Sequence, residues 1–188
     1  MATIDGNQLF HKGSGKIGNY ILRQRNGKTV VYSRPVSETN WAPTPRQQKN
    51  REKFAKANEY SKKVLTDVQL RNFYSGFLKK KHLTIQTVAV RDFRQPPVVE
   101  GIEVRYEQNQ AIIRVEADDD TKVTGVEVTV INRDGQVITR GQAQYAEYWY
   151  WDFNAGELPK IPGGYRVEAI ASDMPGNTGT LTTTLDEQ

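Results

Sequence analysis

The stretch Arg94-Gln95-Pro96-Pro97 separates two residue patterns in this chain of 188 residues. Before it, apolar residues recur at helical spacing, and after it they alternate with polar residues as in β-strands. A Pro-Pro pair does not continue a helix, because proline lacks the backbone N–H and its ring clashes with the preceding turn. We therefore predict an α+β protein of two domains, residues 1–95 and residues 96–188.

The two predicted domains carry opposite charges. Residues 1–95 contain 19 lysines and arginines against 6 acidic residues, whereas residues 96–188 contain 7 against 16. Net charges of +13 and −9 indicate domains that face different partners, or each other.

Composition argues against several classes of protein. No apolar run approaches the roughly 20 residues that span a bilayer, and the N-terminus lacks the apolar segment of a secretory signal. We therefore expect no membrane span and cytoplasmic synthesis without a Sec signal. The chain has no cysteine and only two histidines, so no Ser-His-Asp, Cys-His or zinc set can be assembled. We expect a protein that is not an enzyme.

A β-hairpin is predicted over residues 17–34, because Asn26-Gly27 is the preferred pair for a type I′ turn. This turn places Leu22 opposite Val31 and Ile21 opposite Tyr32, so both faces of the hairpin carry apolar side chains. A two-stranded ribbon cannot bury both faces alone, and its cover is either the following helices or a neighbouring subunit. We predict a protein-contact surface at Tyr20, Ile21, Val30 and Tyr32.

Three helices are expected to follow the hairpin. Thr44-Pro45-Arg46-Gln47 predicts the start of the first, and a second capping box at residues 66–69 predicts the start of the next. The third stretch, residues 84–93, fits either a helix or a strand, and its spacing favours the helix. The apolar stripe of the first helix is Phe54, Ala57, Ser61, Val64 and Leu65.

Basic residues cover the rest of the first helix: Lys49, Arg51, Lys53, Lys56, Lys62 and Lys63. Such a face can neutralise the phosphates of a nucleic acid. It can equally dock on an acidic protein surface, including residues 96–188 of the same or another chain, or remain a solvated surface.

Short motifs in this half resemble a known family. These are Gly15-Lys16-Ile17-Gly18-Asn19, the two hairpin strands, Ser33-Arg34-Pro35 and Thr44-Pro45-Arg46-Gln47, in that order. Together they resemble an uncharacterised protein family widespread in Bacteroidota, over about residues 10–60. The resemblance implies a hairpin followed by a helix, and it implies no activity or site.

The acidic half reads as about seven short strands in some 90 residues, which is typical of an all-β immunoglobulin-like sandwich. Tyr165 lies where a tyrosine corner is expected, at the start of a late strand. The segment from Ala171 to Asn177 resembles the ending of bacterial immunoglobulin-like domains.

Two loops of the predicted sandwich hold oxygen ligands that calcium prefers: Asp118, Asp119, Asp120, Asp173 and Asn177. Calcium is the one cofactor that this sequence suggests. The same residue types also serve turns by accepting hydrogen bonds from nearby backbone amides, and the sequence leaves both interpretations open.

An aromatic run over residues 145–153 predicts one strand. Alternation puts Trp149, Trp151 and Phe153 on one face and Tyr148 and Tyr150 on the other. One face is expected in the core, and the other is either a contact site for protein or glycan or ordinary surface.

Taken together, these patterns suggest a structural or interaction protein. We expect the basic half to anchor in a multi-subunit assembly, such as a phage-like particle, an injection machine or a filament, with the sandwich facing outward. A homo-oligomer or particle subunit is expected. The alternative is a nucleic-acid-binding protein that uses the basic half.

Overall fold

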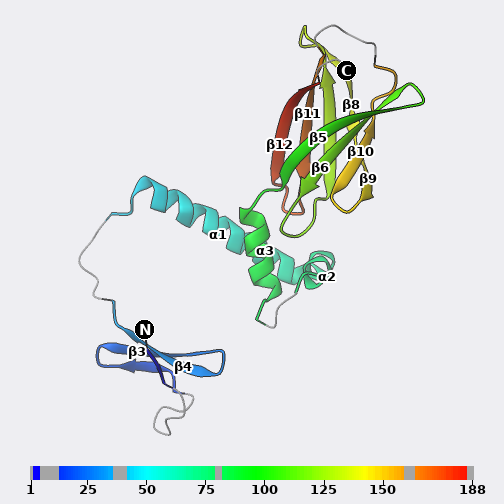
Figure 1. The fold of residues 1–188 in the computed structure, drawn as a ribbon. Coiled ribbons are helices and arrows are strands. Elements are labelled where there is room, and N and C mark those ends of the chain that lie inside the picture. The colour runs from blue at the N-terminus through cyan, green and yellow to red at the C-terminus, as the bar shows by residue number, and fades with distance from the viewer. Residues whose placement is uncertain (1, 5–12, 36–41, 79–81, 159–163, 186–188) are drawn as a thin grey trace. The chain divides into compact units, whose positions relative to one another are not determined.

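A computed structural model describes residues 2–4, 13–35, 42–78, 82–158 and 164–185. Within them, three helices and three antiparallel four-stranded sheets form (Figure 1), so the predicted α+β class is confirmed. Among these residues no helix combines the length and apolar character that crossing a membrane requires. The contacts divide the chain into two compact units, residues 1–44 and residues 45–188.

The first unit is a small sheet in the order β1-β4-β3-β2. Its strands are β1 (Ala2–Ile4), β2 (Gly15–Ile17), β3 (Tyr20–Arg25) and β4 (Lys28–Ser33). The β3–β4 hairpin has the predicted register, with Leu22 opposite Val31 and Ile21 opposite Tyr32. Its turn residues Asn26 and Gly27 have φ angles of 52° and 77°, the two positive values that a type I′ turn needs.

Three helices begin the second unit: α1 (Pro45–Thr66), α2 (Val68–Ser75) and α3 (Ile85–Arg94). Helix α1 starts at Pro45, as the fixed φ of proline at the first helical position predicts. Its buried stripe is Ala57, Ser61 and Val64, whereas Phe54 and Leu65 are exposed, which differs from the predicted stripe. Residues three and four apart share one helix face, and the face that packs is the one centred on Ser61.

The caps of the two short helices correct one prediction. Thr66 is not a cap, because it is the last residue of α1 and its Oγ1 donates to the carbonyl of Lys63 at 2.9 Å. Asp67 caps α2 instead, because its side chain accepts hydrogen bonds from the backbone amides of Gln69 and Leu70. The ambiguous third stretch is a helix, capped by Thr84.

The remaining described residues of this unit form eight strands, in two sheets ordered β5-β6-β10-β9 and β12-β11-β7-β8. They are β5 (Val98–Glu107), β6 (Gln110–Asp118), β7 (Gly125–Ile131), β8 (Val137–Gln142), β9 (Gln144–Glu147), β10 (Tyr150–Asn154), β11 (Tyr165–Ser172) and β12 (Thr178–Leu185). Alternate side chains of both sheets, among them Ile113, Val128 and Val167, share one hydrophobic core. The two sheets therefore form a β-sandwich.

The helices and the sandwich belong to one compact unit, whereas the sequence predicted a domain boundary between them, after residue 95. Only three residues separate the end of α3 from the start of β5, and Pro97 within this link is fully buried. From the sandwich, Met174 packs against the helical core of Val64, Tyr74 and Val88. A Pro-Pro pair thus ends the helical pattern without releasing the helices from the strands that follow.

Candidate functional site

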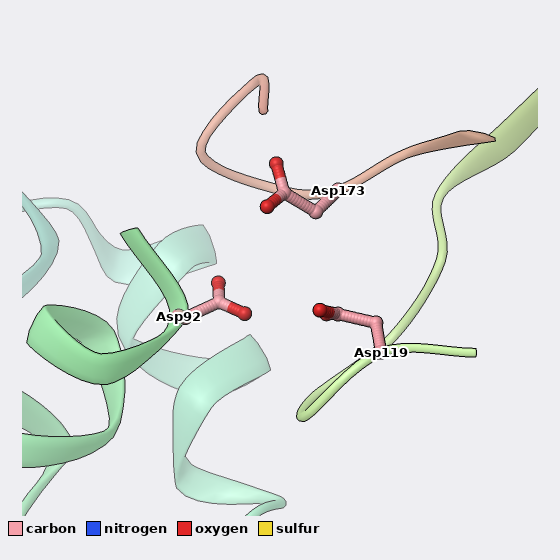
Figure 2. A group of neighbouring side chains, drawn as sticks. All are labelled: Asp92, Asp119 and Asp173. Carbon is pink, nitrogen blue, oxygen red and sulfur yellow. The ribbon is translucent and has the colours of Figure 1, made fainter. Parts of the chain in front are cut away.

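Three aspartates meet where the helices join the sandwich (Figure 2). Asp92 lies near the end of α3, Asp119 directly follows β6, and Asp173 directly follows β11. One carboxylate oxygen from each lies within 4.8 Å of the others. Asp92 is fully buried and Asp173 is 5% exposed, so two of these carboxyl groups are almost withdrawn from water.

Hydrogen bonds to Asp92 arrive from both sides of this junction. The Tyr74 hydroxyl of α2 donates to Oδ2 at 2.5 Å, and the Thr121 hydroxyl donates to Oδ1 at 2.5 Å. The side-chain amide of Asn177 donates to the backbone carbonyl of Asp92 at 3.2 Å. One residue of α3 thereby contacts a second helix and two loops of the sandwich.

The other two aspartates organise their own loops. Oδ2 of Asp119 accepts from the backbone amides of Thr121 and Lys122, at 3.2 and 3.1 Å. Asp173 accepts from the backbone and side-chain amides of Asn177, both at 2.6 Å. Within the described residues, Oδ1 of Asp119 is buried and has no hydrogen-bond partner.

The electrostatics of the cluster disfavour three negative charges. The pKa of Asp92 is raised to about 6, mainly by burial and also by the neighbouring carboxylates of Asp119 and Asp173, although the hydrogen bonds from Thr121 and Tyr74 lower it. Burial also raises the pKa of Asp173. No lysine, arginine or histidine of the described chain forms an ion pair with any of the three. Chemically, such a group of hard oxygens can hold a divalent cation.

The structure brings together part of the predicted calcium set. Asp119, Asp173 and Asn177 converge, whereas Asp118 ends β6 with its side chain exposed. Asp120 points to a different partner, because Arg91 of α3 donates to its carboxylate through Nε at 2.6 Å and through a second, shorter bond.

Asp92 was missed by the sequence reasoning, although the sequence held a signal. It lies three residues after Ala89 and four after Val88, so helical spacing puts it on the same face as these two buried residues. A lone carboxylate on an apolar helix face needs polar partners from another element.

The aromatic run differs from its prediction. Residues 145–153 form two strands rather than one, with Tyr148 and Trp149 in the turn between β9 and β10. Trp151 and Phe153 are buried, so their face is the one in the core, but Trp149 is 47% exposed because it lies in that turn. Neither turn residue is glycine, asparagine or aspartate, so no turn signal marked the position.

Tyr148 is 75% exposed and has a φ of 52°, a value that a bulky residue rarely adopts. Two hydrogen bonds hold this turn: Tyr145 Oη donates to the Tyr148 carbonyl at 3.0 Å, and the Ala117 amide donates to the Trp149 carbonyl at 2.9 Å. Next to it, the Arg114 guanidinium lies 5.3 Å from the ring centre of Tyr150. The result is a fixed turn that displays aromatic rings.

The other predicted surfaces are placed as follows. In the small sheet, Tyr20 is exposed, Ile21 and Tyr32 are half-buried, and Val30 is buried. The six predicted basic residues of α1 are all exposed, and none forms an ion pair with a described residue: Lys49, Arg51, Lys53, Lys56, Lys62 and Lys63.

No protein family matches the chain, and no curated protein is similar to it. Among solved structures it is similar to β-glucuronidase from Ruminococcus gnavus. The complex with uronic deoxynojirimycin is 14% identical with a TM-score of 0.33, and the match covers 48% of this chain and 16% of the enzyme. The apo enzyme is 12% identical, with the same TM-score, over 48% and 15%. The chain spans about a sixth of that enzyme's length, and a likeness this weak says nothing of function.

Proposed function

We propose that this chain is a non-enzymatic structural or interaction protein that anchors in a multi-subunit assembly such as a phage-like particle, an injection machine or a filament. The observation that carries this proposal is the small sheet β1–β4. It is a compact unit of its own, yet Ile17 and Tyr20 are 54% and 57% exposed. A sheet of such short strands gains independent stability only when something covers its apolar side chains.

The register of the β3–β4 hairpin places apolar side chains on both of its faces, so packing against one face alone does not bury them all. Leu22 lies on one face of the β3–β4 pair and Val30 on the other, and both are buried. Beside Val30, the cross-strand pair Ile21 and Tyr32 is only half-buried. Withdrawing a large apolar side chain fully from water contributes about 1.5–3 kcal/mol, so stacking sheets between subunits is favourable.

The sandwich is proposed to be immunoglobulin-like and to face outward. When β5 to β12 are lettered A, B, C, C′, D, E, F and G, the two sheets have the orders A-B-E-D and G-F-C-C′. This grouping is that of immunoglobulin folds. Tyr165, buried at the start of strand F, is in the position of a tyrosine corner.

The turn at Tyr148 supports a contact role for the sandwich. Backbone strain of this kind costs about 1–3 kcal/mol and concentrates at functional positions. Here the strained residue is also the most exposed large side chain of the turn. Exposed tyrosine and tryptophan rings supply contact area at low entropic cost.

Replacing Ile21 and Tyr32 together with aspartate tests the anchoring role. We expect the wild-type chain to form oligomers in analytical ultracentrifugation, and the double variant to sediment as a monomer while the tryptophan fluorescence of the sandwich is unchanged. A matched control changes Arg25 and Ser33 of the same hairpin, both exposed, to aspartate. A wild-type chain that stays monomeric at high micromolar concentration contradicts self-assembly.

The second candidate function is nucleic-acid binding through α1. It is favoured by the six exposed basic side chains of this helix, which have no ion-pair partner among the described residues. If they contact phosphates, the affinity for duplex DNA falls with salt at a log-log slope of about −0.9 for each phosphate neutralised. Reversing the charges of Lys49, Lys53 and Lys56 should then flatten this slope, and an unchanged slope removes the candidate.

A further inference from the structure

We propose that the junction of Asp92, Asp119 and Asp173 is a calcium site that fastens the helices to the sandwich. This goes beyond the proposed assembly role and does not depend on it. The site is composite, because α3, the β6–β7 loop and the β11–β12 loop each contribute one carboxylate.

The separation of the carboxylates fits a single ion. Calcium binds oxygen at about 2.3–2.6 Å, so two ligands on opposite sides of one ion lie about 4.6–5.2 Å apart. The three carboxylate oxygens lie within 4.8 Å of one another, a separation in the range of ligand pairs around one calcium ion.

An unpartnered oxygen points to the ligand independently of the clustering. Oδ1 of Asp119 is buried and accepts no hydrogen bond from a described residue. In Figure 2 the Asp119 carboxylate is directed at Asp92, into the space between the three side chains. A buried carboxylate oxygen without a donor is costly, and a cation in that space supplies the missing partner.

The hydrogen bonds around the cluster leave it short of positive charge. Among the described residues, the donors to the three carboxylates are neutral groups, namely the hydroxyls of Tyr74 and Thr121 and the amides of residues 121, 122, 176 and 177. Arg91, one residue before Asp92 in α3, is paired with Asp120 instead. Neutral donors orient carboxylates but do not balance their charges, which a divalent ion does.

Calcium fits better than magnesium. Its shell accepts six to eight oxygens in flexible geometry, and the ligands here come from two irregular loops and a helix end. Asn177 is the fourth candidate ligand. Its amide nitrogen already donates to Asp173 and to the Asp92 carbonyl, so the side-chain carbonyl oxygen is the atom left for an ion. Magnesium demands near-ideal octahedral geometry and gives up water reluctantly.

Calorimetric titration of calcium chloride into the full chain, after treatment with a chelator, tests the site. We expect uptake of one ion per chain. Asp119→Asn should weaken binding by at least about ten-fold, because it removes a charged ligand while Asn still offers an oxygen to the amides of residues 121 and 122. Asp118→Asn is the matched control, since it removes one carboxylate outside the cluster, and its affinity should equal that of the wild type.

Thermal unfolding supplies a second readout that does not depend on the heat of binding. At the same calcium concentration, the melting temperature of the wild type and of Asp118→Asn should rise, and that of Asp119→Asn should rise by clearly less. The weakest extracellular calcium modules have dissociation constants of about 1 mM, so a titration up to about 10 mM would saturate such a site. The absence of saturable uptake up to about 10 mM calcium therefore overturns the proposal. It is also overturned by equal binding in Asp119→Asn, and magnesium affinity equal to that of calcium overturns the choice of metal.

Discussion

Replacing Gly179 of β12 with alanine tests whether the link between helices and sandwich is as tight as the structure indicates. An added Cβ would lie 1.9 Å from the carbonyl oxygen of Pro97 and 2.9 Å from its carbonyl carbon. Ordinary van der Waals contact begins near 3.4 Å, so one backbone must move by about 1.5 Å. Pro97 is fully buried and belongs to the link between α3 and β5, which leaves it little room to move.

The expected loss follows from these distances. Overpacking typically costs about 1–3 kcal/mol, and this case belongs at the upper end because the obstacle is buried backbone. Alanine recovers about 0.4–1 kcal/mol by restricting the unfolded chain, so we expect a net loss of about 2 kcal/mol. In a unit of this size that lowers the melting temperature by about 4–8 °C. Urea unfolding followed by tryptophan fluorescence measures the free energy directly.

Gly125 of β7 provides the control in the same sheet. Its added Cβ would lie 3.6 Å from the side-chain oxygen of Gln142, an ordinary contact with a flexible group. Gly125→Ala should therefore be neutral or slightly stabilising. If Gly179→Ala loses less than about 0.5 kcal/mol relative to Gly125→Ala, the close approach of β12 to the Pro97 backbone is wrong.

Three further perturbations have defined outcomes. Tyr74→Phe removes the hydroxyl that donates to buried Asp92, and chemical denaturation should show a loss of about 1–3 kcal/mol, whereas an unchanged midpoint contradicts that bond. Tyr148→Gly relieves the positive φ, so unfolding measurements should show no loss of stability, and a loss above about 1 kcal/mol means that the turn is not strained. Removal of residues 1–44 should leave the melting temperature of residues 45–188 within about 2 °C of that of the full chain, because they form a separate compact unit, and a larger fall contradicts this division.

Local chemistry explains which elements were predictable. The β3–β4 hairpin follows from Asn26-Gly27, because the two residues that permit positive φ also fix the register of both strands. The start of α1 follows from Pro45 in the same way. By contrast, the turn at Tyr148 is imposed by pairing of β10 with β6 and β9, and its residue types carry no trace of it.

The aspartate junction was only partly predictable, for a different reason. Asp119, Asp173 and Asn177 were found because they lie in loops, where calcium ligands and turn residues share one composition. Asp92 lies in a helix, and its partner Thr121 is 29 residues away. Periodicity describes which face of a helix is buried, but it does not say which loop will cover that face.

The charges of the chain are balanced within one unit rather than between the two units. Residues 45–188 contain 20 lysines and arginines and 20 acidic residues, so the helices carry the positive charge and the sandwich the negative charge of one neutral body. The Arg91–Asp120 pair joins these parts, but the exposed lysines of α1 have no such partner among the described residues. The basic helices of one copy can therefore attract the acidic sandwich of another copy without any contribution from residues 1–44. Association driven by charge should survive removal of the small sheet and weaken with salt, whereas association driven by its apolar faces should be lost with the sheet and persist in salt.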